Sequence, residues 1–203
     1  MITYILMTTI GIVSYMAFSD QSMKHKLAFY PYGAFHHKEY SRFITSIFVH
    51  ADWTHLLLNL FVLYGFGLAM EREFKDLSIQ LYGSPQVGYL HFLAIFLLSG
   101  IVGDLPDYFM KRNMTHYLSL GASGAISGLL FAFIMLHPTA RMVVFIGIPV
   151  PMVAWLYGIM YVAFSIYASK KNSDNVNHLA HLGGALTGIL YVLFIFPGIK
   201  LPV

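Results

Sequence analysis

The sequence has no cysteine and little charge. Without cysteine among its 203 residues, the chain has no disulfide framework, no thiol nucleophile and no cysteine-based metal or cluster site. Charged residues make up only 10% of the chain, against about 25% in a typical soluble protein. Because 58% of the residues are hydrophobic, the chain also lacks the polar surface that solubility requires. These shortages indicate a membrane protein.

Disorder and nucleic-acid binding are also disfavoured by composition. The 17 Phe, 14 Tyr and 2 Trp are atypical of a disordered chain. The 12 Lys and Arg are scattered singly or in pairs, so we interpret them as residues that flank spans and not as a basic face for nucleic acid. The apolar start of the chain lacks the basic segment and the cleavage site of a secretory signal, which predicts a retained first span.

Six apolar segments are candidates for membrane-spanning helices, which need about 20 mainly apolar residues. They are Ile2–Phe18, Trp53–Met70, Gly88–Val102, Ala122–Leu136, Met142–Ala168 and His178–Phe196. No repeat or linker divides the chain, so we predict one domain over residues 1–203. The predicted fold class is an all-α membrane protein, a bundle of six transmembrane helices in the lipid bilayer. Because no Asp or Glu lies deep inside a predicted span, we expect no carboxylate in the membrane interior.

Several predicted spans begin with polar side chains. Polar groups within a span are costly and usually face the interior of the bundle, so each is a candidate for function. The second, fourth and sixth spans cross in the same direction, which places their starting ends near one face of the membrane. The candidates are His50, His55, Asn59, Ser123, His178 and His181.

Ser123 opens the fourth span within the segment GASG. A helix start offers free backbone N–H groups and the positive end of the helix dipole, which can stabilise an oxyanion. A serine hydroxyl becomes nucleophilic when a base takes its proton. The alternative is a packing role, because Gly121, Gly124 and Gly128 form a stripe of small residues and such stripes pack membrane helices.

His181 is the preferred base for Ser123, since histidine titrates nearest neutrality. It shares a helix face with Gly184 and Gly188, at i+3 and i+7. These glycines let a neighbouring backbone approach, and the fourth span has a matching stripe. We therefore expect the two helices to pack tightly and to bring His181 to Ser123. No Asp or Glu is placed to orient the imidazole, so we predict a dyad.

His55 and Asn59 are four residues apart and project from one face of the second span. Together with the backbone N–H of Ser123, they could donate hydrogen bonds to a developing oxyanion. The alternative is that these polar groups only tie loops together. We favour that structural role for His50.

Several motifs together resemble those of the rhomboid family of intramembrane serine proteases. GASG at 121–124 resembles the GxSG nucleophile motif of the family, and AHLGGALTG at 180–188 resembles its AHxxGxxxG histidine motif. HADWTHLLLN at 50–59 is similar to the family's HxxxxHxxxN on the second span, and Glu71 with Arg72 resembles its ER pair. The order and placement of these motifs make the resemblance specific.

The resemblance implies a six-helix bundle in which a Ser123–His181 dyad lies in a water-filled cavity below the extracytoplasmic surface. It implies a serine endopeptidase that hydrolyses peptide bonds in or near the transmembrane segments of membrane protein substrates, with no cofactor and no metal. The implied oxyanion hole consists of His55, Asn59 and the backbone of Ser123. The implied location is multi-pass in the cell (inner) membrane, and no oligomeric state is predicted.

Two positions depart from the family pattern. Arg42 stands where the first loop usually has an arginine, but Ser41 replaces the tryptophan that often precedes it. Ser127 stands four residues past the nucleophile, where the family often has an aromatic residue that stacks on the catalytic histidine. We therefore expect the His181 ring to be positioned by His178 or by another aromatic residue.

Two other functions and the opposite orientation are the alternatives. The chain could be an inactive rhomboid-like protein that only binds membrane clients, or a metal or haem protein that uses histidine ligands. The positive-inside rule favours a reversed orientation, since a cytoplasmic N-terminus leaves four Lys and Arg on the cytoplasmic side and eight outside. We keep the orientation that the resemblance implies. The histidines of the metal alternative are His50, His55, His178 and His181, and the four cytoplasmic positive residues are Arg72, Lys75, Arg141 and Lys200.

Overall fold

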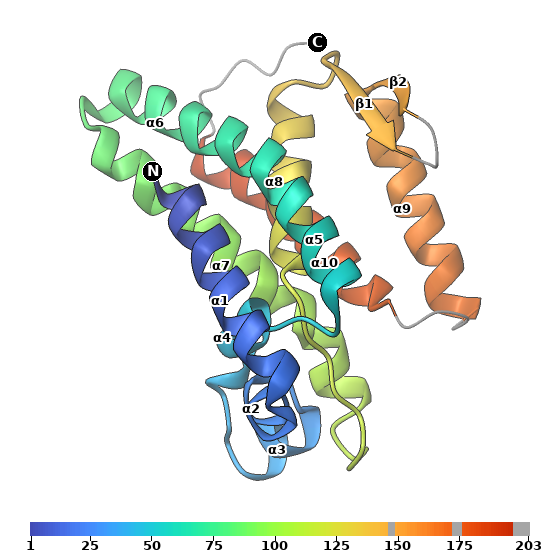
Figure 1. Cartoon of the computed structure of the whole chain (residues 1–203). Helices are drawn as coiled ribbons and strands as arrows, with labels where there is room; N and C mark the ends of the chain where they lie inside the picture. Colours follow the sequence, from blue (N-terminus) through green and yellow to red (C-terminus); the bar gives the residue numbers. More distant parts are fainter. Residues whose placement is uncertain (146–148, 172–175, 197–203) are drawn as a thin grey trace.

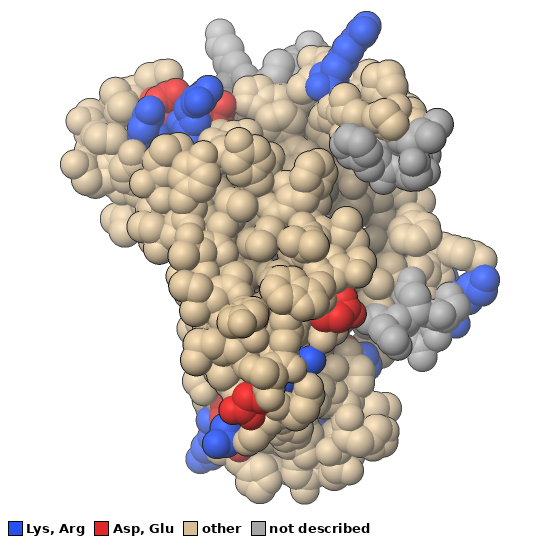
Figure 2. All heavy atoms as spheres, in the orientation of Figure 1, with Lys and Arg blue, Asp and Glu red and all other residues tan. Residues whose placement is uncertain are grey.

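The computed structural model describes residues 1–145, 149–171 and 176–196, so Lys200 lies outside the described residues. The described chain is a bundle of helices with a single two-stranded hairpin (Figure 1). Figure 2 shows groups of charged side chains near the upper end and in the lower part of the molecule, with a largely uncharged band between them. This distribution suits a protein whose middle is surrounded by lipid.

The first spanning helix leads into a loop of short helices that Arg42 holds together. Its guanidinium donates to the carbonyl oxygens of His25 and Ala28, at 2.7 and 2.9 Å, and pairs with Glu39. These elements are α1 (Ile2–Ser19), α2 (Gln21–Leu27), α3 (Pro31–His36), α4 (Arg42–Thr45) and the short η1 (Ser46–Phe48). The first loop is thereby a folded unit that lies at the lower end of Figure 1.

A second long helix consists of α5 (Trp53–Val62), the π-helical turn η2 (Leu63–Gly67) and α6 (Leu68–Tyr82). Buried Glu71 on α6 accepts hydrogen bonds from the backbone N–H groups of Ile2 and Thr3, at 2.8 and 2.9 Å. The first N–H groups of a helix have no partner within it, so Glu71 caps α1 and fixes its start against α6.

The remaining helices are α7 (Pro85–Met110), α8 (Ser123–Leu136), α9 (Ala154–Lys171) and α10 (His178–Ile195). Of the 14 residues of α8, 11 are buried, so α8 forms the centre of the bundle. α9 lies at the edge of the bundle (Figure 1).

The predicted class, an all-α membrane protein, is confirmed. In the described part, four helices are long and apolar enough to cross a membrane, namely Ile2–Ser19, Trp53–Tyr82, Pro85–Met110 and His178–Ile195. Each of the six predicted segments contains a helix. However, α8 has only 14 residues and is about 21 Å long, which is shorter than a bilayer core of about 30 Å.

The predicted fifth span, Met142–Ala168, is wrong before Ala154. Strands β1 (Arg141–Phe145) and β2 (Pro149–Val153) pair antiparallel there, and α9 begins only at Ala154. Pro149 and Pro151 explain the difference, because proline cannot donate a helical hydrogen bond and pushes the residue before it into extended conformations. Hydropathy alone does not separate such an apolar hairpin from a helix.

We expected no carboxylate in the membrane interior, but the helix bundle itself buries several carboxylates. The third predicted span ended at Val102, whereas α7 continues to Met110 and includes Asp104 and Asp107. Both side chains are buried, as is Glu71 in α6. These buried carboxylates are tolerated because each accepts hydrogen bonds. Asp104 accepts from Ser46, Asp107 accepts from Tyr117 and Asn177, and Glu71 accepts from the start of α1.

Candidate active site

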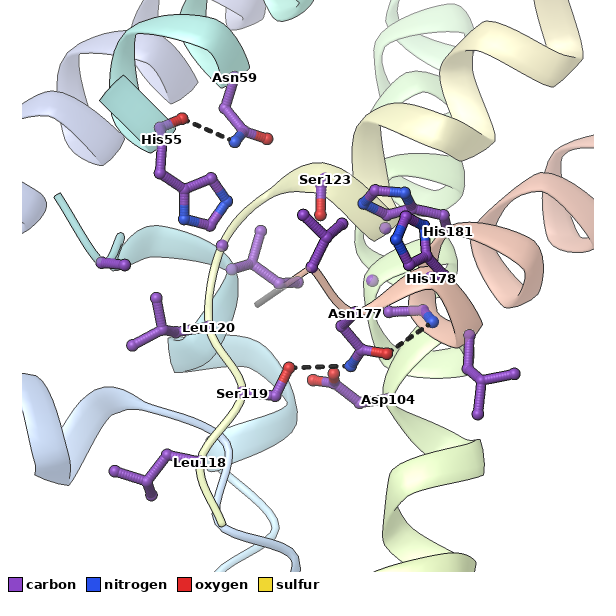
Figure 3. A pocket seen from close by; sticks show the side chains of 18 of the residues that line it. His55, Asn59, Asp104, Leu118, Ser119, Leu120, Ser123, Asn177, His178 and His181 are labelled. Atoms are coloured by element: carbon purple, nitrogen blue, oxygen red, sulfur yellow. Dashed lines mark hydrogen bonds between the residues drawn. The ribbon is translucent and has the colours of Figure 1, made fainter. Parts of the chain in front are cut away.

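A cavity of about 770 Å³ opens where α5, α7, α8 and α10 meet the loop before α8. All four predicted site residues, Ser123, His181, His55 and Asn59, line this cavity. Figure 3 shows the Ser123 side chain beside the His181 ring, with His55 and Asn59 across from them. The structure therefore brings together groups that are more than 100 residues apart in the sequence.

The loop that leads into Ser123 is fixed by backbone hydrogen bonds. The N–H of Gly121 donates to the carbonyl oxygen of Ser46 at 2.9 Å, and Phe29 and Ser119 form a small antiparallel bridge. Gly121 has a positive φ of 120°, and a β-carbon there would lie 2.6 Å from the His55 ring. Only glycine suits both conditions, so Gly121 sets the turn that presents Ser123 at the start of α8.

His50 supports this loop through hydrogen bonds of both its ring nitrogens. The Ala122 N–H donates to its Nε2 at 3.3 Å, and its Nδ1 lies 3.0 Å from the Ser14 hydroxyl. Because Nε2 accepts, the consistent neutral tautomer has its proton on Nδ1. The side chain is fully buried, which agrees with the structural role that we favoured for His50.

The predicted close packing of the two glycine stripes is confirmed. A β-carbon on Gly184 or Gly188 would overlap the carbonyl oxygen of Gly124 or Gly128, respectively. α8 and α10 thus approach backbone to backbone at two successive turns. This contact sets the position of His181 relative to Ser123 along the helix axes.

A polar network fixes the start of α10 and was missed by the sequence analysis. The Asn177 side chain caps α10 by accepting from the Ala180 N–H at 3.1 Å, and it donates to Asp107 at 2.7 Å and to Ser119 at 3.0 Å. The Asp107 carboxylate also pairs with Lys111 at 2.9 Å. An asparagine directly before an apolar helix is a typical N-cap, so Asn177 could have been found from its position.

Both expected sources of aromatic contact reach the His181 ring. The His178 ring lies 5.7 Å from it, edge to face, and the Tyr161 ring of α9 lies 6.0 Å from it at an angle of 31°. Tyr161 had not been identified, because nothing in the local sequence of α9 relates it to α10.

Asp104 lines the same cavity, and its carboxylate accepts from the Ser46 hydroxyl at 3.1 Å.

Asn59 and His55 are joined by a hydrogen bond within α5. The Asn59 Nδ2 group donates to the carbonyl oxygen of His55 at 2.8 Å. A primary amide has two N–H groups, so the second remains for another acceptor. The N–H of His55 is satisfied by the Asp52 side chain at 2.8 Å, which caps α5.

The four histidines of the metal alternative form two pairs. His50 and His55 lie 4.9 Å apart between ring centres, and His178 and His181 lie 5.7 Å apart. Among residues 1–145, 149–171 and 176–196, no three His, Asp or Glu side chains converge as ligands of one metal ion. The geometry therefore gives no support to a four-histidine site.

Several known proteins have sequences similar to that of this chain. The chain is 29% identical over 160 residues to the mitochondrial Rhomboid protein 1 of Saccharomyces cerevisiae, which covers 77% of this chain and 42% of that protein. It is 32% identical to the mitochondrial RHOMBOID-like protein 12 of Arabidopsis thaliana, over 70% of this chain and 42% of that protein. It is 33% identical to the putative rhomboid protease YdcA of Bacillus subtilis, over 75% of this chain and 65% of that protein.

A family domain matches more of this chain than any of these three pairwise alignments does. The chain spans between 42% and 65% of the length of these three relatives. The Rhomboid domain matches residues 37–198, a range that includes Ser123, His181, His55 and Asn59. This match covers most of the chain, and the multi-pass helical fold agrees with it. The chain belongs to the rhomboid family.

Proposed function

We propose that this chain is an intramembrane serine endopeptidase with a Ser123–His181 dyad. The observation that carries the proposal is that both side chains line one cavity and come from helices whose backbones touch. Such contact leaves little freedom for the catalytic pair to drift apart. Membership of the rhomboid family supports the same reaction class.

His181 takes the proton of the Ser123 hydroxyl while the serine oxygen bonds to the carbonyl carbon of the scissile peptide. The carbonyl π electrons move to oxygen, and the tetrahedral intermediate then collapses as His181 donates the proton to the leaving nitrogen. The product is an acyl-enzyme and a free amine. A water molecule, deprotonated by His181, then hydrolyses the ester and restores Ser123.

The oxyanion of the intermediate would be stabilised by hydrogen-bond donors around the cavity. The backbone N–H of Ser123 at the helix start, the His55 ring and the second N–H of Asn59 are the proposed donors. The positive end of the α8 dipole adds to their effect.

The proposed substrates are membrane proteins cleaved in or near a transmembrane segment. The cavity belongs to a helix bundle that exposes many large apolar side chains. It is lined by polar groups such as Asn177 and Asp104 that can hold water. The proposed location is the cell (inner) membrane, with the cavity open to the extracytoplasmic side.

Cleavage of a transmembrane reporter by the detergent-purified protein tests this function. We expect wild type to cut the reporter with and without a chelator, and Ser123→Ala to be inactive. A folded wild type that binds the reporter without cutting it would favour the inactive client-binding alternative. Loss of activity with the chelator would favour the metal alternative.

A further inference from the structure

Ser127 and Tyr161 connect the nucleophile helix to the edge helix α9. The Ser127 hydroxyl and the Tyr161 hydroxyl lie 2.6 Å apart, and Ser127 Oγ also donates to the carbonyl oxygen of Ser123 at 2.8 Å. A serine hydroxyl has one hydrogen, so Tyr161 must be the donor to Ser127. The result is a directed chain of hydrogen bonds from Tyr161 through Ser127 to the backbone of the proposed nucleophile.

The Tyr161 ring is also held on its other sides. The Phe131 ring of α8 contacts it edge to face at 5.5 Å, and the Tyr157 ring lies 6.0 Å away. With its hydroxyl and its ring both fixed, Tyr161 has little freedom to move. Its position is therefore determined by α8, on which Ser123 also lies.

The fixed Tyr161 ring lies against the His181 imidazole, at 6.0 Å between ring centres and 31° between planes. Aromatic ring pairs with centres about 4.5–7 Å apart interact favourably beyond burial alone. The Tyr161 ring thus lies beside the proposed base, and its hydroxyl reaches the helix of the proposed nucleophile.

We propose that Tyr161 is a positioning residue, which with Ser127 holds the His181 ring in line with the Ser123 hydroxyl. This inference rests on the proposed function. Because the arrangement joins residues of three helices, α8, α9 and α10, any displacement of α9 relative to the other two removes the ring from His181.

Substitutions separate the ring from its hydroxyl. Tyr161→Leu removes both the ring and the hydroxyl while keeping apolar volume. We expect its kcat to fall by about 10- to 100-fold with KM little changed, because a misplacement of about 1 Å can cost about 10² in rate. Tyr161→Phe and Ser127→Ala both break the hydrogen bond between the two hydroxyls, and Ser127→Ala also removes the one to the Ser123 carbonyl oxygen. Each should lower kcat several-fold, and the double variant should be no worse than Ser127→Ala alone. Tyr167→Leu, at an exposed position of the same helix, is the matched control.

A second measurement reports on His181 without catalysis. In protein with isotope-labelled histidine, the ring-current shift of the His181 signals should be lost in Tyr161→Leu and kept in Tyr167→Leu. Strict additivity of Tyr161→Phe and Ser127→Ala would overturn the inference. A kcat of Tyr161→Leu equal to that of Tyr167→Leu, with unchanged His181 signals, would also overturn it. A wild type that cleaves nothing would refute the proposed function, while the signals would still decide whether Tyr161 positions the ring.

Discussion

The backbone of Gly124 lies so close to Gly184 that a β-carbon on residue 184 would overlap the Gly124 carbonyl oxygen. No flexible side chain can move aside here, since both contacting groups are backbone. The catalytic proposal depends on this contact, because it brings the helix of His181 to the helix of Ser123.

Gly184→Val should therefore separate α8 from α10 without changing a catalytic group. We expect cleavage to fall by about 100-fold or more and the thermal midpoint to fall as well. Activity should be measured at temperatures where the variant is still folded. Gly11→Val is the matched control, because no atom lies within 4 Å of a β-carbon built at Gly11. Activity of Gly184→Val near that of Gly11→Val would show that the contact is unimportant for catalysis.

Asn59→Ala tests whether Asn59 stabilises the transition state. Removing one oxyanion donor typically lowers kcat by roughly 10²–10³, so we expect that loss with KM little changed. The hydrogen bond from Asn59 to the His55 carbonyl offers a purely structural explanation, which predicts a different result. A variant with a lower thermal midpoint and normal kcat would identify Asn59 as structural.

His50 should make stability depend on pH. Burial, with a smaller effect of His55, lowers the pKa of His50 to about 3, although Asp52 acts in the opposite direction. In the unfolded chain a histidine titrates near pH 6.5. Between these values the unfolded chain binds one more proton than the folded one, so this group lowers stability by about 1.4 kcal/mol for each unit of falling pH.

The variant for this test is His50→Gln, which cannot titrate and can still accept from the Ala122 N–H. Thermal midpoints in detergent at pH 7 and pH 4.5 should differ more for wild type than for His50→Gln. An equal acid sensitivity of the two proteins would contradict a buried neutral His50.

The orientation can be tested with single cysteines, since the natural chain has none. Thr115 lies in the exposed loop before Ser123, and Gln80 is exposed near the end of α6 on the other side. We expect an impermeant thiol reagent outside intact cells to label Thr115→Cys and not Gln80→Cys. The opposite pattern would support the positive-inside count and a cytoplasmic active site.

Local spacing was sufficient to predict much of the site. The i+3 and i+7 glycines beside His181 predicted the approach of α10 to α8, because helix periodicity fixes which residues share a face. The motifs around Ser123, His55 and Asn59 also placed these residues at one depth, since three of the predicted spans run in the same direction.

The remainder depended on contacts that sequence spacing does not encode. Asp107 meets Asn177 across 70 positions, and Tyr161 meets Ser127 across 34. Strands β1 and β2 were missed because the apolar composition of this segment was taken as a span, although Pro149 and Pro151 argue against a helix there.

Covalent labelling of Ser123 tests the central claim most directly. A fluorophosphonate reacts with a serine only when a base activates it, so intact-protein mass spectrometry of the purified chain, followed by peptide mapping, reports on the dyad without a substrate. We predict one adduct, on Ser123, in wild type and in the surface variant Leu186→Val, and none in Ser123→Ala or in folded His181→Ala. Labelling of His181→Ala at the wild-type rate, or an unreactive Ser123 in folded wild type, would contradict the account.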